Sequence, residues 1–116
     1  MALSTNSQIF PAGQTFAIAA TTTSAQTYVT SGSNNLQAVL IENLDTTNDV
    51  FVNWSTNPTV TATVPSGFNG PQAGITIQNG QGKVINLGAQ GTFINNVTIA
   101  ANCVSGTANV HITPVF

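Results

Sequence analysis

The stretch Leu36-Gln-Ala-Val-Leu-Ile-Glu-Asn-Leu-Asp-Thr-Thr-Asn-Asp-Val-Phe-Val-Asn-Trp54 contains two apolar runs separated by polar turn residues. Residues 36–41 are apolar at both parities except at Gln37, as expected of a strand that is buried on both faces. Val50, Val52 and Trp54 then share one face of a second run. The stretch therefore predicts two strands joined by a turn.

Similar short runs fill the rest of the chain, with turn residues about every 8–12 positions, as in a sandwich or small barrel. No apolar spacing indicates a helix, and the abundant Thr, Asn and Gly are poor helix formers. The predicted strands are 15–19, 26–30, 36–41, 50–55, 59–64, 74–78, 83–87, 93–100 and 107–113.

Two of these predictions concern local patterns. Asn79-Gly80-Gln81-Gly82 predicts a hairpin between the flanking runs, because Asn and Gly tolerate the positive φ of tight turns. Thr59–Val64 alternates Thr with apolar residues, which predicts a strand. Its Thr row is similar to those of ice-binding surfaces, but the chain has no fixed repeat, so an ordinary outer strand face is the better interpretation.

Charge is scarce. The 116 residues include one Lys, no Arg, one His and three acids, or 3% charged residues against about 25% in ordinary domains. Phosphate recognition relies on Arg and Lys, and acid–base catalysis needs titratable side chains. We therefore expect neither an enzyme nor a nucleic-acid partner, and no cofactor. Because 41% of the residues are apolar, the chain should fold, and its nearly neutral surface should favour association.

The two ends of the chain differ. Residues 1–14 have no sustained period and include the apolar run Ile9, Phe10 and Pro11, which predicts an extended N-terminal arm before a single sandwich domain, 15–116. The C-terminal Val115 and Phe116 are apolar, whereas free termini are normally polar, so we expect this end to dock onto its own core or a neighbour. The candidate interface residues are Ile9, Phe10, Pro11, Val115 and Phe116.

No run reaches the roughly 18 apolar residues of a membrane span, and the N-terminus lacks the features of a signal peptide. We therefore expect synthesis in the cytoplasm of the host and no membrane partner. The lone Cys103 fits a reducing compartment, and a buried structural thiol is its expected role.

The only cluster of charge is Glu42, Asp45 and Asp49. Asp45, Thr47 and Asp49 have the alternating spacing by which oxygen-rich loops bind Ca²⁺, but the Gly and bidentate Glu of an EF-hand loop are missing. A solvated turn is the favoured interpretation, and no metal ligand is predicted. His111 alternates with apolar neighbours and should lie on the less buried face of its strand.

Four segments carry a family resemblance, namely Ala38–Asn43, Asp49–Trp54, Lys83–Leu87 and Ser105–Thr113. Residues 36–116 resemble the small β-sandwich virion proteins of tailed bacteriophages. In these proteins a first strand ends in Asn and a polar turn, a V-F-V strand follows, and the chain finishes with G-T-A-x-V-x-I-T-P. The family includes head decoration (cement) proteins and minor head or tail components, and it offers no catalytic residues to carry over.

The resemblance and the composition together predict an all-β, jelly-roll-like antiparallel β-sandwich of about eight or nine short strands. The expected function is that of a capsid decoration protein on the outer capsid surface. It would bind the major capsid protein through the arm and one end of the sandwich, as a homotrimer. The alternative is a glycan-binding, lectin-like module of a phage tail or fibre, which would need exposed aromatics or calcium at Asp45–Asp49.

Overall fold

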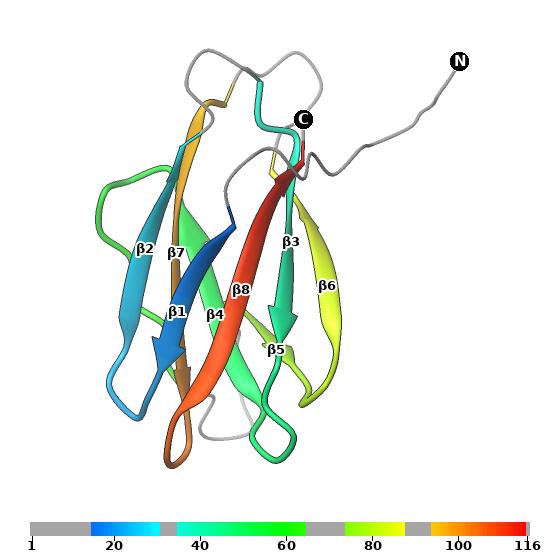
Figure 1. Ribbon diagram of the computed structural model, residues 1–116. Helices are drawn as coiled ribbons and strands as arrows, with labels where there is room; N and C mark the ends of the chain where they lie inside the picture. The colour runs from blue at the N-terminus through cyan, green and yellow to red at the C-terminus, as the bar shows by residue number, and fades with distance from the viewer. Residues whose placement is uncertain (1–14, 31–34, 65–73, 88–93, 116) are drawn as a thin grey trace.

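The computed structural model describes residues 15–30, 35–64, 74–87 and 94–115, which form two antiparallel four-stranded sheets (Figure 1). The strands are β1 Phe16–Ala20, β2 Ala25–Thr30, β3 Ala38–Asn43, β4 Val50–Ser55, β5 Ile75–Ile77, β6 Gly82–Asn86, β7 Asn96–Cys103 and β8 Ala108–Val115. The predicted all-β sandwich is confirmed. The predicted arm, residues 1–14, lies outside the described residues. No helix in the described ranges is long and apolar enough to cross a membrane.

The sheets have the strand orders β1-β8-β3-β6 and β2-β7-β4-β5. The first four strands pair with the last four in reverse sequence, β1 with β8, β2 with β7, β3 with β6 and β4 with β5. Two further pairings, β3 with β8 and β4 with β7, complete the sheets. Each sheet therefore depends on contacts between distant parts of the chain.

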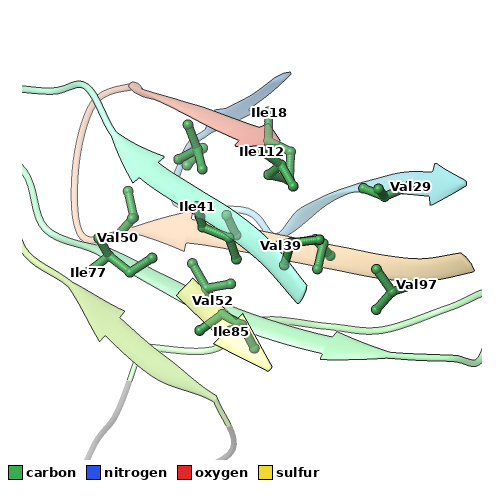
Figure 2. Close-up of a cluster of buried hydrophobic side chains, with 14 of the residues drawn as sticks. Ile18, Val29, Val39, Ile41, Val50, Val52, Ile77, Ile85, Val97 and Ile112 are labelled. Atoms are coloured by element: carbon green, nitrogen blue, oxygen red, sulfur yellow. The ribbon is translucent and has the colours of Figure 1, made fainter. Parts of the chain in front are cut away.

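The core fills the space between the two sheets and consists mainly of Val and Ile (Figure 2). Along β3, Val39 and Ile41 face this core, and from the facing sheet Val50 and Val52 of β4 do the same. Branched side chains pack well on a pleated surface, and each fully buried one contributes about 1.5–3 kcal/mol through removal of apolar surface from water.

One strand, β7, is buried on both faces. Thr98, Ala100 and Asn102 alternate with its core residues, and their exposed fractions are only 1%, 0% and 5%. Ala100 lies in one row across the sheet with Gln26 of β2 and Asn53 of β4. The side chains of Gln26 and Asn53 form hydrogen bonds to a segment that covers this row.

That covering segment is residues 58–62, part of the predicted strand Thr59–Val64. The strand prediction is wrong, because these residues bond to side chains and not to a neighbouring strand. The Gln26 side chain accepts from the Val60 N–H at 3.0 Å and donates to the Pro58 carbonyl at 3.2 Å. Asn53 Nδ2 donates to the carbonyl of Thr61, and Ser24 Oγ accepts from the N–H of Ala62.

The predicted hairpin at Asn79–Gly82 is also wrong, although its turn is present. Gly80 has φ 71°, and the N–H of Gln81 donates to the carbonyl of Gln78 at 3.0 Å. The flanking strands do not pair with each other, since β5 pairs with β4 and β6 pairs with β3. The turn therefore carries the chain from one sheet to the other, and this lets Ile77 and Ile85 face the core from opposite sides.

Candidate functional site

The acidic candidates of the 42–49 stretch and Cys103 lie at or next to one end of the sandwich, at the bottom of Figure 1. Four connections lie there, residues 21–24, 44–49, 78–81 and 104–107, which we call the aspartate end. Backbone hydrogen bonds join them to each other and to the strand ends. The N–H of Gly80 donates to the carbonyl of Asp45 at 3.0 Å, and that of Cys103 to Thr21 at 2.8 Å.

Asn43, the last residue of β3, anchors this end. It is 1% exposed, and its Nδ2 donates to the carbonyls of Asn48 at 2.8 Å and Ile77 at 3.1 Å. Its Oδ1 accepts from the N–H of Asp45 at 3.0 Å. Both amide hydrogens and the amide oxygen are thus used, which a buried amide requires. Asn43 therefore connects β3, the turn that follows it and β5.

The carboxylate of Asp45 closes the 44–49 turn from within. Its Oδ2 accepts from Asn48 N at 2.6 Å, Thr47 N at 3.1 Å and Thr47 Oγ1 at 3.0 Å. These hydrogen bonds, first that from the backbone of Asn48 and then those from Thr47, lower the pKa of Asp45 below its ordinary value of 3.8.

The three carboxylates do not converge on one point. Asp49 Oδ1 accepts from the N–H and the side-chain amide of Asn79 at 3.0 and 3.2 Å, and so holds the 78–81 turn. Glu42 lies within β3, opposite Gly82 and His111. No group of three or more His, Cys, Asp or Glu in the described part of the chain is placed to hold a metal ion. Both aspartates act as hydrogen-bond acceptors: Asp45 within its own turn, and Asp49 between this turn and the 78–81 turn.

Cys103 and His111 lie where the sequence placed them. Cys103 is 1% exposed, with its Sγ 3.4 Å from the carbonyl oxygens of Ala20 and Ser105, so the prediction of a buried thiol is confirmed. His111 is half-buried on the outer face of β8, in register with Ala17 and Glu42. This is the less buried face of the strand, as predicted.

The side chains of Trp54 and Tyr28 and one terminal interface candidate are described by the structure, and they differ in burial. Trp54 is partly buried against the core, whereas Tyr28 is 50% exposed on the outer face of β2. Val115 is 2% exposed and pairs with Ala38, so it is buried in its own fold. The other interface candidates, Ile9, Phe10, Pro11 and Phe116, lie outside the described residues.

An open depression of about 360 Å³ lies where β5 and β6 diverge. It is lined by Thr76, Gln78, Gln81, Gly82 and Lys83. This lining combines one ammonium with amide and hydroxyl groups, so it can donate hydrogen bonds to a bound molecule. Among the described lining residues Lys83 is the only titratable group, so these residues provide no acid–base pair for catalysis.

Sequence reasoning missed two features of this region. One is the anchoring role of Asn43. The available signal for this role is an Asn that lies between a buried apolar run and a polar turn. The other is the exposed strand β6, where Val84 is 55% exposed. The sequence contains no signal for that exposure, because the run 83–87 has the same pattern as the other predicted strands.

A scan against protein-family models and searches of curated proteins and of solved structures found no match to this chain.

Proposed function

We propose that this chain is a structural protein of a virus particle, a capsid decoration protein of a tailed bacteriophage. It would bind the major capsid protein on the outer surface of the shell and associate with itself as a homotrimer. The supporting observation is the outer face of the sheet β1-β8-β3-β6. Small or apolar side chains, Ala17, Ala19, Leu40 and Val84, contribute to it, and Glu42 and His111 are its only ionisable groups among the described residues.

Such a face suits a contact that is repeated many times over a shell. Apolar burial and neutral hydrogen bonds are little affected by salt, whereas exposed ion pairs are screened within about 10 Å at 0.1 M salt. The residues that carry the family resemblance also fall on the structural frame, since they occupy β3, β4, β6 and β8.

We infer further that the sandwich is a jelly roll. The pairing of the first four strands with the last four in reverse order is what a long hairpin produces when it rolls into two sheets. A jelly roll presents broad sheet faces and two loop-bearing ends, and a decoration protein can use either for a partner.

Light scattering and capsid binding test the proposal. The native mass, measured at two concentrations with and without EDTA, should be that of a trimer at the lower concentration, and EDTA should not change it. The protein should then bind undecorated capsids, with an affinity that changes less than about threefold between 50 and 500 mM NaCl. A monomer that leaves capsids undecorated would contradict the proposal.

The arm has its own test. Deletion of residues 2–12 should leave the melting temperature unchanged and abolish capsid binding, because the arm is proposed to lie along a neighbouring subunit. A deletion variant that no longer folds would instead show that the arm belongs to the core.

One observation favours the alternative, a glycan-binding module of a tail or fibre. Tyr28 is 50% exposed on the outer face of β2, and exposed aromatic rings are what sugars stack against. Binding to a glycan array that is lost in Tyr28→Ala but kept in Val104→Ala would support this alternative. Loss of that binding in EDTA would additionally indicate that it requires a divalent cation.

A further inference from the structure

The strand β6 ends the sheet β1-β8-β3-β6 and has a partner on one side only (Figure 1). It pairs with β3, and no other strand among the described residues pairs with it. Four of its five residues, Gly82, Lys83, Val84 and Asn86, are exposed. The other sheet margins are less available, because β1 and β2 pack against each other and β5 has only three residues.

The register shows which backbone groups of β6 are free. The N–H of Leu87 donates to Gln37 and the N–H of Asn43 donates to Gln81, each at 2.9 Å, so hydrogen-bonded pairs occur at both ends of the β3–β6 ladder. In an antiparallel ladder such pairs recur at every second residue. Lys83 and Ile85 therefore bond to β3, while Gly82, Val84 and Asn86 direct their N–H and C=O groups away from it.

We propose that β6 pairs antiparallel with β6 of a second copy of this chain, about a two-fold axis at Val84. Residue 84 then lies opposite residue 84 of the second copy, and residue 82 lies opposite residue 86. All the free groups of the three residues are used, in about six hydrogen bonds. The two sheets become one continuous eight-stranded sheet.

A second copy of this chain is a suitable partner for the β6 edge, because the free N–H and C=O groups of the edge are complementary to those of an identical edge. The free groups are centred on Val84, so a two-fold axis leaves no donor or acceptor unpaired. The 55% exposed Val84 side chains would bury their apolar surface against each other. Neither Gly82 nor Asn86 carries a charge, so no like charges lie opposite each other across the axis.

Lys83 is compatible with this pairing. An edge lysine can oppose strand addition when its charge is forced into the new contact. Here Lys83 lines the open depression beside β6, and in the proposed register it lies opposite Ile85 of the second copy. Its methylene stem would cover that side chain while the ammonium remains in the solvent of the depression.

The contact goes beyond the proposed function and does not depend on it. A two-fold contact joins chains in pairs, whereas the proposed trimer requires a three-fold contact elsewhere. A chain with both contacts would link one trimer to the next. Pairing through β6 can therefore hold or fail whether or not the protein decorates a capsid.

Cysteine crosslinking of the full chain tests the register. In a hydrogen-bonded antiparallel pair the two Cα atoms are about 5.5 Å apart, which a disulfide can span. Val84→Cys should form a disulfide-linked dimer under mild oxidation at least about tenfold faster than Val104→Cys. Val104 is the matched control because it is 66% exposed, so random collision would crosslink it at least as readily. Asn86→Cys should also be slow, since its two copies lie about 14 Å apart in this register.

A second measurement does not require a disulfide. Val84→Asp places two carboxylates opposite each other, and should abolish the concentration-dependent association that the pairing predicts for the parent chain, measured by sedimentation velocity. Val104→Asp adds the same charge elsewhere and should leave that association intact. The inference is overturned if Val84→Cys crosslinks no faster than Val104→Cys, or if Val84→Asp associates like the parent chain.

Discussion

At the end of β3, the amide of Asn43 spans the space between the 44–49 turn and β5. Beside it, Asp45 and Asp49 accept hydrogen bonds from the backbone of two turns. None of these residues contributes to the apolar core, yet together they fix the path of the chain in the turns at the ends of the strands. At the scale of single residues, the aspartate end is therefore held by side-chain hydrogen bonds that one substitution can remove.

Asn43→Ala should lower the free energy of unfolding by about 2 kcal/mol or more, because it leaves an N–H and two carbonyls without their partner in a buried site. Asn109→Ala is the matched control, since Asn109 is exposed in the neighbouring strand, and it should change stability by less than about 0.5 kcal/mol. Urea unfolding measures both. Equal stability of the two variants would show that Asn43 is not an anchor.

Protonation of Asp45 should destabilise the fold in acid. Its pKa is lowered in the folded state, so its stabilising contribution is present above its ordinary pKa of 3.8 and is lost as the pH falls through the folded value. The melting temperature should thus fall on acidification below about pH 4. In Asp45→Asn this fall should be shallower. Melting curves from pH 2 to 7 that are parallel for the two proteins would contradict the assignment.

The connections between elements determine which strands become neighbours. The turn at Gly80 sends β5 and β6 to different sheets, and residues 58–62 cover the outer face of β7 in place of a ladder. At the start of β5, Gly74 has φ 89° and lies so close to β4 that a Cβ would overlap the carbonyl oxygen of Val52. Local conformation and close approach together place these elements.

Gly74 and Gly80 form a matched pair for separating those two effects. Both have positive φ, which costs an L-residue about 1–2 kcal/mol. A Cβ on Gly80 would meet nothing within 4 Å, whereas one on Gly74 would collide with backbone. Gly80→Ala should therefore cost about 1–2 kcal/mol of unfolding free energy, and Gly74→Ala clearly more. Equal costs in urea unfolding would mean that the close approach to β4 relaxes without penalty.

The whole molecule is dominated by pairings between distant segments. β1 pairs with β8, so Phe16 lies opposite Ile112, and each sheet contains strands from both halves of the chain. Pairing of this kind must bring remote segments together before any ladder forms. Loop-closure entropy therefore opposes the early steps of folding.

Refolding should accordingly take milliseconds to seconds and not microseconds. Trp54 is the only tryptophan and packs partly against the core, so its fluorescence reports on sandwich formation. Stopped-flow dilution from urea measures the rate. Complete recovery of the fluorescence within the dead time of mixing would show that local structure, and not sheet closure, limits folding.

Local patterns were enough to predict several features from the sequence. The alternation along β4 and β8 and the apolar run of β3 identify strands whatever their partners, because side chains alternate with a period of two in any sheet. The absence of a helical period predicted the all-β class. The burial of Cys103 followed from the general behaviour of free thiols.

Only the tertiary structure decided how those strands are combined. Asn79-Gly80 favours the same turn whether its flanking strands pair with each other or join different sheets. Thr59–Val64 alternates like a strand, although part of it is hydrogen-bonded to side chains of β2 and β4 and not to a strand. The anchoring role of Asn43 likewise depends on Ile77, 34 residues away. The physical reason is shared: strand partners, and the buried polar groups between them, are selected by contacts between remote segments, which a local sequence pattern does not contain.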